Sequence, residues 1–499
     1  MDNPDTIEAQ FSRVVSAHSD QVALVDGTNR LTYLELACLA NSFASLLRER
    51  LNLSPGQILL AWLNNCSEFV VSYLAAAQCG AILFPLNTNW RVPELKWILD
   101  RHLPIAGVLT KQALNFPQDA ISECIPLERL LMFDDPNELP LLQLTSHAMS
   151  AAHTCVRLSP DQPAVYFTSS GSTGIPKLIS RSQRNMVSAA MGMACALRLK
   201  AGLRFLSAVP FYHGNGFDNS LSLPLLSGAT IVLQPQFAMS QFLESMAEHQ
   251  IQVLIGSPAI FELLVRVKAH PRSLSAMEIC ASSGGPLAME VIETIRERYS
   301  VGIQQIYGAS ETAEIAVSAP QGGPSLVPVP GVSIAIFNSE GNSLPAYEKG
   351  EIAVQGPAVA NGYVGDPDGT SRAFTEGYYR TGDLGFLDAD GNLTLLGRLR
   401  PMINLSGTKV DPIEIEQVFL KLAGVNACRV LSELGPQKNQ ILKALVAVQE
   451  GANLTREDII GHCRQLLAEY KIPRIIKLVP ALPEDGTGKD RILWGHARE

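Results

Sequence analysis

The stretch SSGSTGIPK at residues 169–177 places two glycines, four hydroxyl side chains and one lysine within nine positions. Backbone N–H groups and small hydroxyls can surround an anion closely, so this composition predicts a phosphate-binding loop. The common phosphate loop has glycine directly before its lysine, whereas Pro176 stands before Lys177 here. Proline has no N–H to donate. The pattern therefore excludes a P-loop kinase, and a plain Ser/Gly-rich surface loop is the alternative.

Two carboxylates stand in short motifs further along the chain. Glu311 ends YGASE (307–311), and Asp383 ends RTGD (380–383). Magnesium takes one or two protein carboxylates together with phosphate oxygens, so Glu311 could hold this cation. A carboxylate can also accept hydrogen bonds from ribose hydroxyls, as it does in dinucleotide-binding folds. The alternatives are a solvated glutamate at a helix start and an ordinary turn aspartate.

Three further side chains could act on phosphate or on a bound acid. Arg398 opens the segment GRLRPMINLSGTKVDPIEIE (397–416), and its planar fork could reach a ribose or an α-phosphate. Lys489 lies in GTGKDR (486–491), where a solvated surface lysine is the alternative. His213 lies in PFYHGNGF (210–217), where a structural histidine is the alternative.

Five of these motifs resemble, in their order along the chain, those of the adenylate-forming (AMP-binding) ligases, which include acyl-CoA synthetases, adenylation domains of peptide synthetases and luciferases. They are SSGSTGIPK, YGASE, RTGD, GRLRPMINLSGTKVDPIEIE and GTGKDR. The resemblance runs through nearly the whole chain. It implies that a carboxylate attacks the α-phosphorus of ATP, that magnesium pyrophosphate leaves, and that a thiol then displaces AMP. The thiol is that of CoA or of a carrier-protein phosphopantetheine. The stretch at 169–177 would hold the departing β- and γ-phosphates.

The resemblance also implies roles for individual residues. It identifies Lys489 as the mobile catalytic lysine, His213 as the gate beside the acyl carboxylate, and Glu311 as the magnesium ligand. ATP or AMP would contact Ser170, Gly171, Ser172, Thr173, Gly174, Lys177, Gly284, Gly285, Tyr307, Gly308, Ser310, Asp383 and Arg398, with Tyr307 stacked on adenine. The acyl pocket would contain Asn215, Gly256, Ser283 and Ala309, and the thiol would approach Ser406 and Gly407.

Two positions bear on the choice of substrate and on the second step. Amino-acid-activating members of the family place an aspartate near the gate; this position is Asn215 here, which favours a plain fatty or aromatic acid, although Asp218 lies three residues further on. The family's hinge residue is Arg400, followed by Pro401. A residue before proline avoids the αR region, so this hinge is expected to favour one rotational state.

Composition and charge limit the class of protein. With 48 acidic and 39 basic residues the formal net charge is −9, and no basic block indicates nucleic acid as a partner. Nine cysteines without a C-x-x-C pair indicate reduced thiols. The most apolar segment, at 70–86, is interrupted by Gln78, Gly80 and Pro85, so it predicts a buried helix and strand and no membrane span. We expect a cytoplasmic protein.

The elements that must position these residues follow an α/β pattern. Helix-period and strand-like segments alternate over the first 300 residues, which predicts βαβ units and largely parallel sheets. Examples are a helix at 32–51, a strand at 58–63, a helix at 69–78 and a strand at 81–86. Short strands with Asp-Gly and Glu-Gly turns over 325–397 predict antiparallel hairpins in a small β subdomain. About 100 residues after Arg398 are expected to form a separate α+β unit.

The sequence therefore predicts a large N-terminal AMP-binding domain (1–398) and a small mobile C-terminal domain (399–499) that carries the catalytic lysine. ATP and Mg²⁺ are the expected cofactors and CoA is the expected co-substrate. A stand-alone adenylation enzyme that loads a carrier protein or forms an amide is the second hypothesis. A non-catalytic nucleotide-binding homologue is the third.

Overall fold

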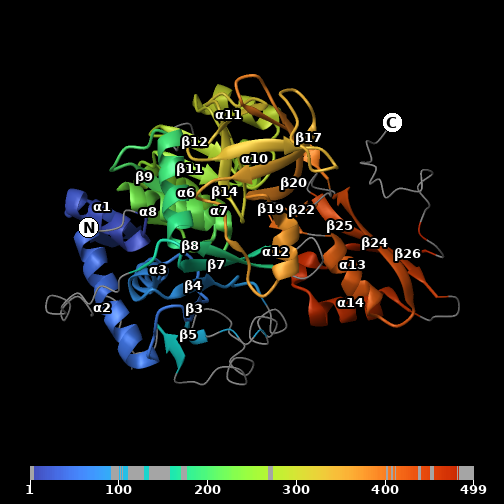
Figure 1. Cartoon of the computed structure of the whole chain (residues 1–499), viewed down its shortest axis with the longest axis horizontal. Helices are drawn as coiled ribbons and strands as arrows, with labels where there is room; N and C mark the ends of the chain where they lie inside the picture. Colours follow the sequence, from blue (N-terminus) through green and yellow to red (C-terminus); the bar gives the residue numbers. More distant parts are fainter. Residues whose placement is uncertain are drawn as a thin grey trace.

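The computed structural model describes residues 5–90, 101, 103, 105–110, 129–133, 158–169, 177–267, 274–399, 403–405, 408–410, 412–435, 440–449, 454–479 and 482. Two mixed sheets with helices packed around them make up the part before Arg398 (Figure 1). Two smaller sheets follow it. This mixed α/β architecture, with a large sheet-containing N-terminal part and a small C-terminal part, confirms the predicted fold class.

The larger sheet joins a parallel half to an antiparallel half. Strand β13 (Gln304–Ala309) pairs in parallel with β12 (Ile279–Ser282) and in antiparallel with β14 (Ala313–Ser318). The parallel side continues through β11 (Val253–Gly256), β9 (Arg204–Ser207), β10 (Thr230–Leu233) and β1 (Val22–Asp26), with β2 (Asn29–Thr32) antiparallel at the edge. The antiparallel side continues through β15 (Ser325–Pro328), β21 (Leu393–Arg398), β20 (Tyr378–Leu387), β17 (Gly350–Gln355) and β16 (Ser333–Phe337), and β19 (Phe374–Thr375) pairs with β20.

The hairpins expected to form a small β subdomain thus extend the parallel sheet, because β13 bonds to both halves. The predicted turn at Asp390-Gly391 does join β20 to β21, with Gly391 at φ 81°. This left-handed conformation is one that glycine adopts at little cost.

The second sheet is built from the apolar runs near the N-terminus. Its order is β18 (Gly362–Tyr363), β8 (Lys177–Ser182), β7 (Pro163–Ser169), β4 (Ile82–Pro85), β3 (Ile58–Ala61), β5 (Ile105–Thr110) and β6 (Leu130–Met132). Strands β3 and β4 are buried throughout and pair in parallel, Ile58 opposite Ile82. Continuous burial on both faces accounts for their unbroken apolar sequence.

Helices pack on these sheets at the places that the sequence period indicates. Helix α2 (Tyr33–Leu51) begins with a capping box in which Thr32 and Glu35 bond each other's backbone N–H groups. Helix α3 (Ser67–Cys79) is almost completely buried. The other helices of this part are α1 (Ile7–His18), α6 (Gln183–Ala196), α7 (Gly214–Gly216), α8 (Leu223–Ser227), α9 (Met239–Glu248), α10 (Pro258–Val267), α11 (Met289–Tyr299) and α12 (Pro367–Ala373).

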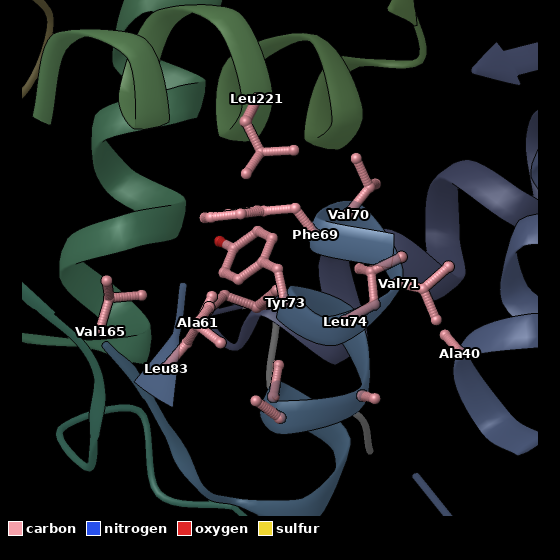
Figure 2. Packing of buried hydrophobic residues seen from close by; sticks show 14 of the residues in the cluster. Ala40, Ala61, Phe69, Val70, Val71, Tyr73, Leu74, Leu83, Val165 and Leu221 are labelled. Atoms are coloured by element: carbon pink, nitrogen blue, oxygen red, sulfur yellow. The ribbon is translucent and has the colours of Figure 1, made fainter. Parts of the chain in front are cut away.

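A π-helix (Phe217–Ser222) lies between α7 and α8, and all of its residues are buried. Figure 2 shows Leu221 of this π-helix lying over Phe69 of α3, with the ring of Tyr73 beneath. The Tyr73 and Ser222 hydroxyls lie 3.3 Å apart. Because a π-helix widens the turn and is common at functional sites, the segment that follows His213 is a place to look for ligand-binding side chains.

The C-terminal part has its own apolar core of residues between Ile403 and Ile472. Its elements are β22 (Ile403–Leu405), β23 (Thr408–Val410), α13 (Pro412–Leu420), β24 (Val425–Leu434), β25 (Gln440–Val448), α14 (Arg456–Leu466), a 3₁₀ turn (Glu469–Lys471) and β26 (Ile475–Val479). In Figure 1 these elements lie together at one end of the molecule. The sequence IEIEQVFLKLAG at 413–424 predicts a helix that ends at Gly424, whereas α13 ends at Leu420. Across the described ranges, no helix combines the length and apolar composition that a membrane crossing requires.

Candidate active site

The residues predicted for the acyl pocket lie where parallel strands end. Gly256 ends β11, Ser283 follows β12, and Ala309 ends β13. These three strands are successive neighbours in the sheet, and the N–H of Ser283 donates to the Gly256 carbonyl at 2.9 Å. In α/β sheets, ligands bind outside the carboxyl ends of parallel strands. The structure therefore brings these residues to the edge where a ligand site is expected.

The segment after β9 brings Asn215 to this edge, beside the predicted residues Gly284 and Ser310 of other segments. Asn215, on α7, donates from Nδ2 to the Ser283 carbonyl at 3.3 Å and accepts at Oδ1 from Asn219 at 3.0 Å. A Cβ on Gly284 would lie 3.5 Å from Asn215 Nδ2, and one on Gly214 would lie 3.5 Å from Ser310 Oγ. Asn215 is thus held in one orientation between the π-helix and the end of β12. Gly285 follows Gly284 in the same loop.

His213 precedes α7 and stacks at a tilt against Tyr212, with 4.7 Å between ring centroids. Burial lowers the pKa of the imidazole from its ordinary 6.5 to about 4. Desolvation penalises the charged ring, so His213 is neutral at physiological pH. A neutral, partly buried ring can limit the size of a pocket or hydrogen-bond a carboxylate, but it adds no positive charge.

Three predicted nucleotide-binding residues meet at one carboxylate. Tyr307 donates its hydroxyl to Asp383 Oδ2 at 2.7 Å, and Arg398 Nε forms a short ion pair with Asp383 Oδ1. Asp383 on β20 and Arg398 on β21 are directly opposite each other in the sheet. Burial is the first cause that raises the pKa of Tyr307 well above its usual value, and the charge of Asp383 is the second, so the phenol stays protonated and donates.

The Tyr-Gly of YGASE and the Thr-Gly-Asp of RTGD predict tight turns, and the structure differs from this prediction at both places. Asp383 lies inside β20 and not in a turn; the pairing of β20 with β17 is irregular around Thr381–Asp383, where Gly382 has φ 71°. Tyr307 and Gly308 are strand residues at a register shift between β13 and β14. A Cβ on Gly308 would lie 2.4 Å from Glu314 Oε2, so only glycine fits there. Bulges of this kind redirect side chains and are frequent beside active sites.

Glu311 lies in the turn between β13 and β14 and is 7% exposed, so it is neither solvated nor at a helix start. The hydroxyl of Tyr363 donates to its Oε1 at 3.0 Å. Tyr379, on β20, also hydrogen-bonds Glu311 and Tyr363, and burial followed by the charge of Glu311 raises the pKa of Tyr379 well above its usual range. Two protonated phenols therefore hold this carboxylate.

Lys177, at the start of β8, pairs with Ser169, at the end of β7, and these two residues are the described ends of the predicted phosphate loop. Its Nζ lies 4.2 Å from the centroid of the Tyr363 ring. The lysine and Glu311 therefore reach the same tyrosine from two segments far apart in the sequence. An ammonium over an aromatic face is attracted by the ring quadrupole.

Comparisons with known proteins identify the family. The family model of the AMP-binding enzyme matches residues 11–364, and that of the AMP-binding enzyme C-terminal domain matches residues 414–489. The chain belongs to the AMP-binding enzyme family. This confirms the resemblance to adenylate-forming ligases that the ordered motifs carry.

Relatives of this AMP-binding enzyme extend over its whole length. It is similar to the oxalate–CoA ligase of Arabidopsis thaliana, with 26% identity over 99% of each chain. It is also similar to the sulfoacetate–CoA ligase of Cupriavidus necator, with 29% identity over 97% of this chain and 96% of the relative. The fold resembles that of o-succinylbenzoate CoA synthetase from Bacillus subtilis, with a TM-score of 0.83, 24% identity and 96% of each chain covered.

Several predicted residues of this AMP-binding enzyme lie outside the described residues. They are the phosphate-loop positions Ser170, Gly171, Ser172, Thr173 and Gly174, the hinge Arg400, the predicted thiol-facing Ser406 and Gly407, and the catalytic Lys489. Their roles remain predictions from the resemblance.

Asp218, the possible amine ligand, is engaged elsewhere. It lies on the π-helix, and its Oδ2 accepts from Arg181 Nη1 at 2.7 Å in an ion pair whose two side chains are 7% and 0% exposed. Burial raises the pKa of Asp218, and Arg181 opposes this shift. With its charge compensated inside the fold, Asp218 does not offer a free carboxylate to a substrate.

The sequence reasoning missed Tyr363, Tyr379 and Arg181. The alternation in YYRTGD would have placed Tyr379 on the same face of the strand as Asp383, since side chains of a strand alternate between faces. Arg181 lies in the β8 sequence KLISRS, two residues after Ile179 and on the same face of a buried strand, where a cation needs an acidic partner. No local signal identifies Tyr363, because the two charged residues that it contacts, Glu311 and Lys177, are 52 and 186 positions away in the sequence.

Proposed function

We propose that this chain uses ATP to activate a carboxylic acid as an acyl-adenylate and then passes the acyl group to the thiol of CoA. In the first step a carboxylate oxygen bonds to the α-phosphorus, and the bond from this phosphorus to the bridging oxygen breaks and releases pyrophosphate. In the second step the thiol sulfur bonds to the acyl carbon, and AMP and the thiol proton leave. The observation that carries this proposal is the convergence of Tyr307 and Arg398 on Asp383. Tyr307 lies four residues before Glu311, so the two carboxylate sites are joined by one short segment.

The donor atoms at Glu311 fit magnesium. The carboxylate is buried, and its Oε1 accepts a hydrogen bond from the Tyr363 hydroxyl. Within the described part of the chain no three His, Cys, Asp or Glu side chains group around a metal position. Nucleotide phosphates and water would complete the coordination beside Glu311. Bound magnesium would neutralise part of the triphosphate charge. The Lys177 ammonium would contact the leaving pyrophosphate.

At the ribose end, Asp383 would accept a hydroxyl hydrogen bond while Arg398 holds the carboxylate in position. Tyr307 would lie along the adenine. At the acid end, the neutral ring of His213 and the fixed amide of Asn215 would border the substrate carboxylate.

A plain carboxylic acid is the substrate class that we propose. Asn215 stands where amino-acid-activating members have aspartate, and Asp218 is paired with Arg181. Relatives that cover nearly the whole chain are named for plain acids, including feruloyl-CoA synthase from Amycolatopsis and indoleacetate–CoA ligase from Aromatoleum aromaticum. A fatty or aromatic acid remains our proposal.

The roles of the residues outside the described ranges also belong to the proposal. Lys489 would stabilise the approach of carboxylate and α-phosphate, and the segment from 399 would rotate about Arg400 to bring Ser406 and Gly407 toward CoA. The separate apolar core after Ile403 supports a division into residues 1–398 and 399–499.

Pyrophosphate exchange tests the first step directly. The wild-type chain should incorporate labelled pyrophosphate into ATP only when its acid is present, so a panel of fatty, aromatic and amino acids identifies the class. Lys489→Ala should lower exchange by about 10²–10³-fold, since one preorganised charge donor is lost. The same variant should convert a synthetic acyl-adenylate and CoA to thioester at a near wild-type rate. Normal exchange by Lys489→Ala would remove this lysine from the first step.

Two other functions are separated by the same experiment. A carrier-protein or amide-forming enzyme would show exchange but no CoA thioester; an amide bond synthetase from Marinactinospora thermotolerans shares the fold, with a TM-score of 0.83 at 24% identity. A non-catalytic nucleotide-binding protein would bind ATP and exchange no pyrophosphate with any acid.

A further inference from the structure

Tyr363 lies between the segment that follows the phosphate loop and the turn that carries Glu311. In the backbone, Tyr363 pairs with Ile179 of β8, and the N–H of Val364 donates to the Leu178 carbonyl at 2.7 Å. Three residues before Tyr363, the N–H of Ala360 donates to the Glu311 carbonyl at 2.7 Å. The short segment 360–364 is therefore bonded to both predicted phosphate-binding elements.

The side chain of Tyr363 repeats this connection. Its hydroxyl donates to Glu311 Oε1 at 3.0 Å, and its ring lies 4.2 Å from Lys177 Nζ. Phe374 packs against the ring edge-on, with 5.6 Å between centroids, and Tyr363 is 8% exposed. The ring is thus held by packing, while its hydroxyl contacts the Glu311 carboxylate and its face contacts the Lys177 ammonium.

The two contacts have different chemical requirements. The bond to Glu311 needs the hydroxyl, whereas the contact with Lys177 needs only the aromatic face. Removing a donor from a buried carboxylate leaves part of its charge unsatisfied. Tyr379 is a second donor to the same carboxylate, so loss of one hydroxyl weakens this arrangement and does not abolish it.

We propose that Tyr363 is a positioning residue that couples the metal-binding carboxylate of Glu311 to the phosphate-binding ammonium of Lys177. This inference rests on the proposed function, because it takes Glu311 as the magnesium ligand and Lys177 as a pyrophosphate contact. The hydroxyl holds Glu311 Oε1 and so fixes the orientation of the carboxylate that would bind the cation. The ring keeps the ammonium at the end of the loop that faces the same phosphates.

Calorimetric binding of ATP, without acid and therefore without turnover, separates the two contacts. Tyr363→Phe keeps the ring and should weaken ATP binding about tenfold in the presence of Mg²⁺ while leaving metal-free ATP binding unchanged. Tyr363→Leu loses the ring as well and should weaken metal-free ATP binding about threefold. Tyr347→Phe is the matched control, because Tyr347 is 63% exposed and its ring contacts Phe386, near the end of β20 opposite to Tyr379.

Each outcome decides a specific point. A wild-type chain that binds no ATP overturns the proposed function and with it the coupling. Metal-dependent binding by the wild type, together with unchanged binding by Tyr363→Phe, overturns the coupling alone. If Tyr363→Phe weakens binding equally with and without Mg²⁺, the residue has only a structural role and the proposal is wrong. Unchanged metal-free binding by Tyr363→Leu would remove Lys177 from the proposal.

Discussion

The buried pair of Arg181 and Asp218 makes a strong prediction about stability, because only one partner can lose its charge. Two unit charges 2.7 Å apart attract by about 6 kcal/mol at an effective dielectric constant of 20. Removing each ion from water costs several kcal/mol in the opposite direction. Burial already raises the pKa of Asp218, so this carboxyl can take up a proton, whereas a guanidinium stays charged at all physiological pH values.

Asp218→Asn should therefore destabilise the fold more than Arg181→Met. The first leaves a buried, uncompensated guanidinium, and the expected cost is about 3–5 kcal/mol. The second leaves a carboxyl that can protonate, and the expected cost is about 1–3 kcal/mol. Arg181→Met combined with Asp218→Leu removes both charges and should return most of the lost stability.

Urea unfolding followed by tryptophan fluorescence measures this order. Three of the four tryptophans lie before residue 100, so the signal reports on the large N-terminal part. A chain of this size does not unfold in one step, and the midpoint of the transition is the quantity to compare. The reasoning is wrong if Asp218→Asn is no more costly than Arg181→Met, or if the double variant is less stable than both single ones.

The pH dependence of Arg181→Met gives an independent check. Without the cation, the native state holds the Asp218 proton at pH values where the unfolded chain has released it. The native state then binds more protons than the unfolded state, so stability is present below the ordinary carboxyl pKa and falls as pH rises through the raised value. A variant whose stability rises over this range would contradict the assignment.

Three further predictions concern the site itself. Glu311→Gln should lower pyrophosphate exchange at low Mg²⁺ and recover part of its rate at high Mg²⁺; full activity at low Mg²⁺ would remove Glu311 from the site. Asp383→Asn should raise the KM for ATP by about tenfold to a hundredfold and leave the KM for the acid unchanged, since hydrogen bonds to an ionised group are lost. The pKa of His213, lowered to about 4, means that the unfolded state binds more protons between about pH 4 and 6.5. Wild-type stability should therefore fall as pH falls through this range, and His213→Phe should show a smaller fall in urea midpoints.

The helices and strands were predictable where burial requires a simple pattern of apolar residues in the sequence. Continuous apolar runs identified the buried strands β3 and β4, and the helical period identified α2, although Thr32, which was expected inside the helix, caps it. Which strands become neighbours was not predictable. Strand β1 pairs with β10, about two hundred residues later, and such pairing depends on sheet order that no local residue encodes. The continuation of the antiparallel hairpins from β13 was missed for the same reason.

The site was predictable in composition and not in local geometry. The motifs gave the residue types and their order, yet Asp383 and Tyr307 were expected beside turns and lie in strands with irregular pairing. A bulge is defined by the mismatch between two strands, so one strand's sequence cannot reveal it. Tyr363 was missed because a contact partner of a buried carboxylate leaves no periodic signal.

The position of the site follows from the change of strand direction at β13. Parallel strands on one side bring Gly256 and Ser283 to their carboxyl ends, where an acid can bind between loops. Antiparallel strands on the other side bring Asp383 and Arg398 directly opposite each other, which suits one carboxylate held by one cation. A strand that pairs with both kinds of neighbour is the place where these two arrangements can meet. The chain leaves β13 at Ala309 and reaches Glu311 two residues later, so the proposed metal ligand lies between the acid end and the nucleotide end. A bond must form there between a carboxylate and a phosphate, and the sheet itself sets the separation of the groups that hold them.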